Sequence, residues 1–300
     1  MSVSTITMKA QKALRRISVP PRFAAAHLQA SMEEVNGESD EVYLMASSVK
    51  FATPLDICAL RTLIDHASEK ARRVHLECPS DPGVHRYLER MNLYEGLPDN
   101  VTLSSPRPPI RRQPLGTKLI ELSRIICDED VEILMDRIAE IAGEQFGRRS
   151  TVTVAFATAV GAAAENVVMH AQSRTGALVA AQRYQRTGLE LAVVDRGLGI
   201  PRTLAANPRH RGLSDLDAVE RSLEDKVSSS LAEGRGAGLW ELCDAVAASR
   251  NATLAIASGR ADLSLSWTDG VLHRNPSTPA KPISGTWISI RLEAGKEKQQ

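Results

Sequence analysis

Three short polar motifs, separated by apolar stretches, hold the residues of this chain that could bind a ligand. The first begins at Glu165-Asn166 and ends at His170; Asn166 and His170 are four residues apart and therefore share one face of a helix. An asparagine in an Ala/Val-rich helix needs polar partners if it is buried, and its amide oxygen is a suitable ligand for Mg²⁺. Taken alone, such an asparagine is more often a helix cap or a surface residue.

The second motif extends from Val193 to Pro201 and has the sequence VVDRGLGIP. An apolar strand leads into Asp195, whose carboxylate can accept a hydrogen bond from an exocyclic amine such as that of adenine. Gly197 and Gly199 allow the backbone to turn sharply and to approach a ligand closely. A dinucleotide-binding fingerprint would need a third glycine at position 202, which is arginine, so that interpretation fails.

The third motif, Gly234-Arg235-Gly236-Ala237-Gly238, comes directly before an apolar helix predicted over residues 238–248. Alternate glycines leave backbone N–H groups free at the start of a helix, which makes an anion site, and Arg235 adds a positive charge beside it. The chain contains no GxxxxGK[ST] sequence, so the P-loop class of nucleotide hydrolases is excluded.

In this order the motifs resemble those of the GHKL (Bergerat-fold) ATPase superfamily, which includes histidine kinases, gyrase B subunits, mismatch-repair ATPases and anti-sigma-factor serine kinases. The segment around Asn166 resembles the N box, and the two glycine-rich segments, 195–199 and 234–238, resemble the two glycine boxes. Gly285-Thr286, opening the last predicted strand, resembles the Gly-Thr pair whose hydroxyl helps to bind adenine. The resemblance covers about residues 117–295.

This resemblance implies that the chain binds ATP and Mg²⁺. Asn166 would hold the metal against the phosphates, and Asp195 would recognise the adenine amino group. Residues 202–233 would form a mobile lid over the nucleotide, and His170 would be a structural companion of Asn166. The other residues implied in cofactor binding are Gly197 and Gly199 at the adenine, Gly234, Arg235, Gly236 and Gly238 at the phosphates, and Thr286.

The position of the general base differs from the family pattern. The hydrolytic and serine-kinase branches have a glutamate four residues before the N-box asparagine, and this chain has Ala162 there. Glu165 is the remaining candidate catalytic base, but it lies about 100° around the helix from Asn166. Loss of a general base lowers a rate by about 10²- to 10⁴-fold. The leading hypothesis is therefore an ATP-binding regulatory protein with slow or absent hydrolysis.

Two alternatives stay open. One is an active ATPase or a serine/threonine protein kinase of the anti-sigma type that uses another residue as its base; Ala162 argues against it. The other is a degenerate interaction scaffold that no longer binds nucleotide, against which the intact Asp195 and glycines argue. The resemblance implies a regulatory protein partner, for which a sigma-factor-like system is the family expectation. It leaves open whether the chain forms a homodimer.

The expected fold is α/β (α+β), with a small α/β domain ahead of the ATP-binding domain. Residues 1–38 are interpreted as a poorly anchored arm that could contain one strand, 39–98 as the small domain, 99–116 as a proline-rich linker, 117–295 as the GHKL domain and 296–300 as a tail. The small domain resembles STAS-like domains in Phe51-Ala-Thr-Pro54, in 74–79 and in 87–91. Thr53 lies where such domains carry a phosphorylated serine, but the Asp-Ser-Ser-Gly sequence is missing. The linker is alternatively a basic PxxP ligand.

The resemblance to the GHKL superfamily implies a two-layer α/β sandwich with a mixed, largely antiparallel sheet for the second domain, and hydrophobic periodicity predicts its elements. Helices are expected at 128–141, 150–170 and 238–248, and strands at 177–182, 189–194, 252–258, 263–268 and 285–292. Residues 118–126 are either a strand or a turn. In the small domain, His66 is the one histidine considered as a phosphoacceptor, and it is interpreted instead as a solvated helix residue.

Composition narrows the class of protein further. The 300 residues are 43% hydrophobic, with 37 basic and 36 acidic side chains and only 4% aromatic residues. This balance argues against nucleic-acid binding. The apolar runs are shorter than the roughly 20 residues of a membrane span, and the N-terminus has no apolar signal segment. The four scattered cysteines have no metal-site or disulfide spacing, so a reduced cytoplasm is the expected location.

Overall fold

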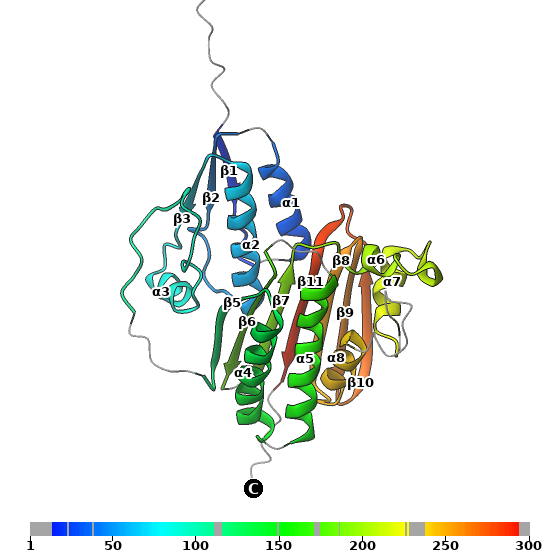
Figure 1. Ribbon diagram of the computed structural model, residues 1–300. Coiled ribbons are helices and arrows are strands. Elements are labelled where there is room, and N and C mark those ends of the chain that lie inside the picture. The colour runs from blue at the N-terminus through cyan, green and yellow to red at the C-terminus, as the bar shows by residue number, and fades with distance from the viewer. Residues whose placement is uncertain are drawn as a thin grey trace, which may run out of the picture.

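The computed structural model describes residues 14–22, 24–37, 39–110, 116–148, 150–170, 175–185, 187–225, 227 and 238–293. Its strands form two sheets, and its helices lie beside and between these sheets (Figure 1). The predicted mixed α/β class is therefore confirmed. The tail predicted at 296–300 lies outside the described residues.

The first unit, residues 14–104, contains a parallel sheet of four strands in sequence order. Strands β1 (Leu14–Ser18), β2 (Glu41–Met45), β3 (Arg73–Glu77) and β4 (Val101–Leu103) are joined by helices α1 (Ala25–Val35), α2 (Pro54–Lys70) and α3 (Pro82–Arg90). Successive right-handed crossovers place such helices on one face of the sheet. Strands and helices share one core there, which includes Leu44, Leu63 and Leu88.

Helix α2 begins at a capping box. The Thr53 hydroxyl accepts a hydrogen bond from the Asp56 backbone N–H at 3.2 Å, and the Asp56 carboxylate accepts one from the Thr53 N–H at 2.8 Å. Pro54 occupies the first turn, where its missing N–H costs no helical hydrogen bond. Thr53 therefore acts as the cap of this helix.

The prediction that residues 1–38 form an arm is wrong for the part that the structure describes. β1 pairs with β2 in parallel, and α1 buries Leu28, Met32 and Val35 in the core of the first unit. These three residues have the i, i+4, i+7 spacing of a helix face. The Pro20-Pro21 pair separates the strand from the helix instead of marking an unstructured segment.

The predicted linker at 99–116 is also wrong in its first part. Residues Val101–Leu103 form β4 and pair with β3 at the edge of the sheet. Beyond the strand, Arg107 makes two 2.8 Å hydrogen bonds to Glu89 and a third, of 2.9 Å, to Glu95. The basic side chain at the centre of the PxxP alternative is thus paired within the first unit. Residues 111–115 lie outside the described part of the chain.

Among the described residues, the second unit contains seven strands in the order β10-β9-β8-β11-β7-β6-β5, and every neighbouring pair is antiparallel. The sheet expected to be mixed and largely antiparallel is therefore wholly antiparallel here. The strands are β5 (Leu119–Ile125), β6 (Ala177–Tyr184), β7 (Gly188–Asp195), β8 (Ala252–Gly259), β9 (Ala261–Thr268), β10 (Val271–Ser277) and β11 (Ile283–Leu292). Residues 118–126, predicted as a strand or a turn, thus contain a strand. β10 is an additional strand that periodicity did not predict, because all seven of its residues are exposed at the edge of the sheet.

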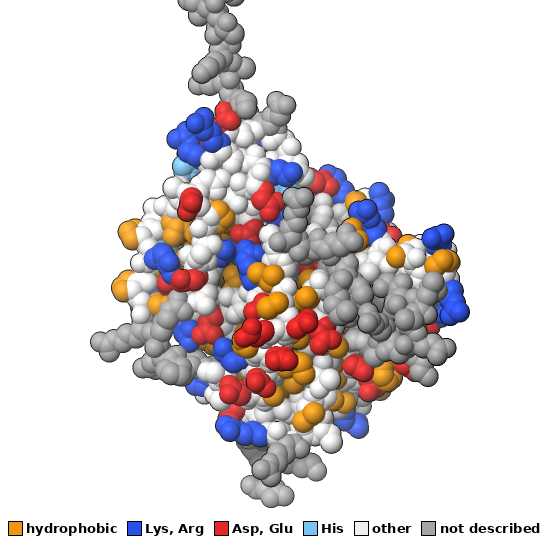
Figure 2. All heavy atoms as spheres, viewed as in Figure 1, with side chains coloured by type: hydrophobic (Ala, Val, Ile, Leu, Met, Phe, Trp, Pro, Cys, Tyr) orange, Lys and Arg blue, Asp and Glu red, His pale blue; other side chains and the backbone are white. Residues whose placement is uncertain are grey.

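Helices α4 (Asp128–Phe146), α5 (Thr151–His170) and α8 (Gly238–Ala247) cover one face of this sheet. The first turn of α4 contains Asp128, Glu129 and Asp130, whose charges suit the positive end of the helix dipole. Figure 2 shows acidic side chains gathered over the exposed face of α4, beside hydrophobic ones. The helix predicted at 128–141 is therefore confirmed, and it extends to Phe146.

The other face of the second sheet is covered by the first unit. Leu178, Ala180 and Val194 belong to the same buried cluster as α1 and α2, whereas their strand neighbours Val179 and Val193 face the α4–α5 side. The layers are thus sheet, helices, sheet, helices, and α2 lies between the two sheets (Figure 1). The predicted two-layer sandwich describes only the second sheet with α4, α5 and α8.

Within the described residues, one helix is long and apolar enough to cross a membrane by length and composition alone. This window, Thr151–Val168 of α5, has a mean hydropathy of 1.4, and 50% of it is buried inside the fold. Its buried residues, including Phe156, Val160 and Ala163, pack into the core of the second unit. A core helix meets the same criterion, so the window by itself is weak support for a membrane span.

Candidate functional site

Asp195 is a buried carboxylate of the second unit with a shifted pKa. It ends strand β7, and only 2% of it is exposed. One carboxylate oxygen accepts a hydrogen bond from the Gly197 N–H at 2.6 Å, and the other accepts one from the Thr286 N–H at 3.1 Å. Burial raises the pKa of Asp195 to about 6, although these hydrogen bonds and one from the Thr286 hydroxyl act in the opposite direction.

The Asp195 carboxylate has acceptor capacity beyond its two backbone hydrogen bonds. A carboxylate can accept about four hydrogen bonds, and the N–H groups of Gly197 and Thr286 supply two of them. A neutral donor such as an exocyclic amine could bind to a remaining lone pair without adding a second charge. The predicted residues Asp195, Gly197 and Thr286 are therefore brought together at one point.

Two glycines allow the segments around Asp195 to cross at close range. Gly285 has a φ of +73°, and a Cβ atom there would lie 2.0 Å from the Asp195 carbonyl oxygen. Gly199 has a φ of +80°, and its Cβ atom would lie 2.9 Å from the Gly285 carbonyl oxygen. Any side chain at position 285 would thus both strain the backbone and separate the 195–199 segment from β11.

Ser258 is a residue of this site that the sequence analysis missed. Its side chain is fully buried at the end of β8, where the hydroxyl donates to the Gly285 carbonyl at 2.8 Å and accepts from the Ile200 N–H at 2.9 Å. It therefore links the segment after Gly199 to the turn before Thr286. The available signal was a hydroxyl at the end of the apolar run ATLAIAS, where a buried polar group needs partners.

A second cluster joins the first and third motifs. Asn166 is partly buried on α5, and Gly238 begins α8. A Cβ atom on Gly238 would lie 2.6 Å from the Asn166 side-chain nitrogen and 3.0 Å from the Ala162 carbonyl oxygen. The start of α8 therefore lies directly against α5 at Asn166, and glycine permits this approach.

Both clusters lie at the same end of the second sheet. α5 ends at His170, and the next strand begins at Ala177, which pairs with Asp195. Gly234, Arg235 and Gly236, predicted at the phosphates, lie outside the described residues, as does the side chain of His170. The predicted glycine-rich phosphate loop is thus represented here by Gly238.

The segment predicted as a lid, residues 202–233, is folded where the structure describes it. It contains the end of α6 (Ile200–Leu204), a 3₁₀ turn (Pro208–His210) and α7 (Asp215–Ser222). Val219 is fully buried in the core of the second unit, and the Asp215 carboxylate accepts a hydrogen bond from the Arg260 N–H at 2.6 Å. The segment predicted as a lid therefore contains helical elements that pack on the second unit, and its role as a lid stays a prediction.

The position at which the resemblance implies a general base lies on α5 and is occupied by Ala162. Ala162 is partly buried one turn before Asn166, and its side chain cannot accept a proton. Glu165 is exposed on α5 beside Asn166. Position 162 and the remaining candidate base, Glu165, therefore have different surroundings, and the partly buried position is the one without a carboxylate.

His66 is not a solvated residue, contrary to the interpretation from sequence. It is 6% exposed on α2, the helix that lies between the two sheets. Its Nδ1 atom lies 3.0 Å from Arg196 Nη2, and its Nε2 atom lies 3.0 Å from Asn36 Oδ1 and 3.2 Å from the Met32 carbonyl oxygen. Both ring nitrogens are therefore engaged, which leaves neither ready to act as a phosphoacceptor.

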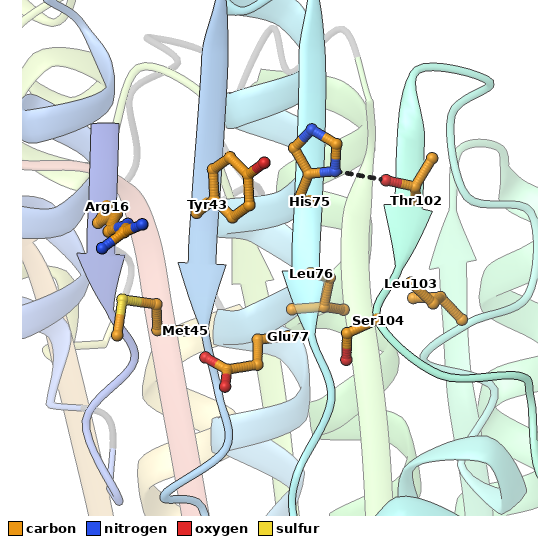
Figure 3. A pocket seen from close by; sticks show the side chains of 9 residues that line it. All are labelled: Arg16, Tyr43, Met45, His75, Leu76, Glu77, Thr102, Leu103 and Ser104. Atoms are coloured by element: carbon orange, nitrogen blue, oxygen red, sulfur yellow. Dashed lines mark hydrogen bonds between the residues drawn. The ribbon is translucent and has the colours of Figure 1, made fainter. Parts of the chain in front are cut away.

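A hollow of ≈ 460 Å³ lies on the face of the first sheet that its helices leave open (Figure 3). Arg16, Tyr43, His75 and Thr102 form a row across the four strands in direct register. The Tyr43 and His75 rings stack at 4.3 Å, and His75 Nδ1 lies 2.9 Å from the Thr102 hydroxyl. These side chains are partly or fully exposed, unlike the buried carboxylate of Asp195.

No protein-family model matches this chain, and no curated protein matches it either. The inference of function therefore depends on the residues of the site and on the motif resemblance.

Proposed function

We propose that this protein is an ATP-binding regulatory protein whose second unit is a GHKL-type nucleotide domain and whose first unit is STAS-like. The observation that carries the proposal is the buried Asp195 carboxylate, which accepts two backbone N–H groups and has lone pairs left to accept a further donor. The amino group of adenine is a neutral donor that could hydrogen-bond to a remaining lone pair of this carboxylate. Asn166 and Gly238, at the same end of the sheet, have the chemistry for a Mg²⁺–phosphate group.

The residues near Asn166 fit the metal and the phosphates in type. The Asn166 amide carries a hard oxygen of the kind that Mg²⁺ prefers, and Mg²⁺ commonly takes one or two protein ligands while keeping water and phosphate oxygens. The N-terminus of α8 offers backbone N–H groups to an anion. Bound ATP would supply the adenine amine and the phosphate charges that these groups recognise.

We propose slow or absent hydrolysis because Ala162 occupies the position of the general base. Binding of ATP would then shift the population of conformations rather than drive chemistry. The partner would be a regulatory protein, with a sigma-factor-like system as the family expectation. The cytoplasm is the proposed location, because Cys127 is an exposed free thiol.

The deciding experiment is a calorimetric titration of the full chain with ATP, with and without Mg²⁺, followed by a turnover assay on the same sample. Binding without turnover is the expected result. Binding with turnover would favour the ATPase or kinase alternative, and the Glu165→Gln variant would then test whether Glu165 is the base. Absence of binding would overturn the proposal in favour of the scaffold alternative.

Adenosine binding should weaken at acidic pH. Asp195 titrates at about 6, and protonation occupies a lone pair that would otherwise accept the adenine amine. Between pH 7 and pH 5 the dissociation constant of adenosine is expected to rise about tenfold in all. The measurement is calorimetry between pH 5 and 8, with adenosine as the ligand because it has no phosphate to titrate. A constant affinity over this range would contradict the role of the carboxylate.

Introducing a carboxylate at the vacant base position should raise ATP turnover. If only the base is missing, Ala162→Glu is expected to increase the turnover rate by about 10²-fold or more. Ala155→Glu is the matched control, because it places the same charge on an exposed position of the same helix two turns away. An unchanged rate in Ala162→Glu, with ATP still bound, would show that the site lacks more than its base.

A further inference from the structure

The side chain of Arg196 connects the candidate nucleotide site to the first unit. Arg196 lies between Asp195 and Gly197, yet its guanidinium group points to α2. Its two terminal nitrogens donate to the two carboxylate oxygens of Glu69 at 2.8 and 2.7 Å, and one of them also donates to His66 Nδ1 at 3.0 Å. The Arg196 side chain is 19% exposed, so solvent competes weakly for these contacts.

The protonation states are consistent with a defined network. Burial and the neighbouring Arg196 lower the pKa of His66 to about 4, so its ring is neutral near pH 7. Because Arg196 can only donate, His66 Nδ1 accepts, and the proton is on Nε2. That Nε2–H donates toward Asn36 Oδ1 and the Met32 carbonyl oxygen at the end of α1. The network thus extends from the Asp195 turn through α2 to α1.

A second contact reaches the other side of the same site. The Gln29 side-chain oxygen, on α1, accepts a hydrogen bond from the Ser284 N–H at 3.2 Å, directly before Gly285 and Thr286. A Cβ atom on Gly285 would lie 2.8 Å from Arg196 Cα, so the two segments touch. Neither segment can move far without the other, and the first unit holds both.

We propose that Glu69 and His66 are positioning residues for the nucleotide site, acting through Arg196, so that the first unit sets the affinity for nucleotide. This inference rests on the proposed function. Because coupling between two sites is reciprocal, nucleotide binding would in turn strengthen the contact between α2 and the Asp195 turn. A protein partner that displaces α2 would lower nucleotide affinity, which gives the first unit a role in regulation.

The test is the Glu69→Gln variant, which removes the charge of the partner and keeps its size. Glu69 is 45% exposed, so the fold should tolerate the change. The dissociation constant of ATP is expected to rise about fivefold or more. Arg196→Gln should raise the dissociation constant of ATP by a similar factor. The double variant should lose no more ATP affinity than the single variant with the larger loss, because all three variants break the same interaction.

Tyr87→Phe is the matched control. It removes a hydrogen bond between the same two units, from Tyr87 to Gln182, which pairs with Glu190 near the opposite end of the β6–β7 ladder from Asp195. Its ATP affinity should equal that of the original chain. An affinity within twofold of the original in Glu69→Gln would overturn the proposal, and so would an equal loss in Tyr87→Phe.

Hydrogen exchange without nucleotide separates this proposal from the proposed function. In Glu69→Gln, the amides of residues 195–199 and 284–287 are expected to exchange faster, whereas those near Gln182 should not change. If the original chain does not bind ATP, the proposed function fails, but this exchange pattern still shows positioning by Glu69. Unchanged exchange at both segments would overturn the positioning role itself.

Discussion

Asp195→Asn is expected to weaken ATP binding by about 2 kcal/mol, or roughly 30-fold in dissociation constant. The variant loses the charge that strengthens the hydrogen bond to an adenine amine. It also cannot keep both present partners, because each carboxylate oxygen accepts a backbone N–H, from Gly197 and from Thr286. An amide nitrogen would place a donor against one of these donors. Calorimetric titration with ATP measures the loss.

Glu190→Gln is the control for this variant. Glu190 lies on the same strand, five residues before Asp195 or roughly 17 Å away along an extended chain, and burial raises its pKa too. It tests whether neutralising any partly buried carboxylate of β7 lowers nucleotide affinity. Equal losses in the two variants, or an unchanged affinity in Asp195→Asn, would contradict the assignment of Asp195 to the adenine.

Gly285→Ala is expected to lower the free energy of unfolding by about 3 kcal/mol or more and to abolish nucleotide binding. The new Cβ atom would lie 2.0 Å from the Asp195 carbonyl oxygen and 2.8 Å from Arg196 Cα, and backbone atoms cannot move aside cheaply. The φ of +73° adds the strain of a left-handed conformation. Denaturant unfolding followed by circular dichroism measures the stability.

Gly147→Ala is the control that separates the cost of backbone strain at positive φ from the cost of the steric clash of the new Cβ atom. Gly147 has a φ of +90° at the end of α4, but a Cβ atom there would meet nothing within 4 Å. Its expected cost is therefore only the backbone strain, about 1 kcal/mol. If Gly285→Ala were no more destabilising than Gly147→Ala, the close crossing of the two segments at the site would be refuted.

Local sequence patterns predicted the individual elements of the second unit well. The helices that start at Asp128 and Gly238 have apolar residues at helical spacing. The strand that ends at Asp195 is an apolar run followed by a polar residue. Edge strand β10 is not predicted because it has no buried face, and α1 is not predicted because the polar residues around it hide its core face. Periodicity indicates an element only when one of its faces is buried and recognised.

The sequence by itself determined the residue types of the candidate site, because a carboxylate followed by alternate glycines is chemistry that local order specifies. Only the tertiary structure decided that Ser258 and Gly285 close around Asp195, since those segments are far apart in the chain and meet through strand pairing. It also decided that α2 covers the second sheet and holds Arg196 through Glu69. Contacts of this kind depend on which faces of separate elements pack together, and no local spacing encodes that choice.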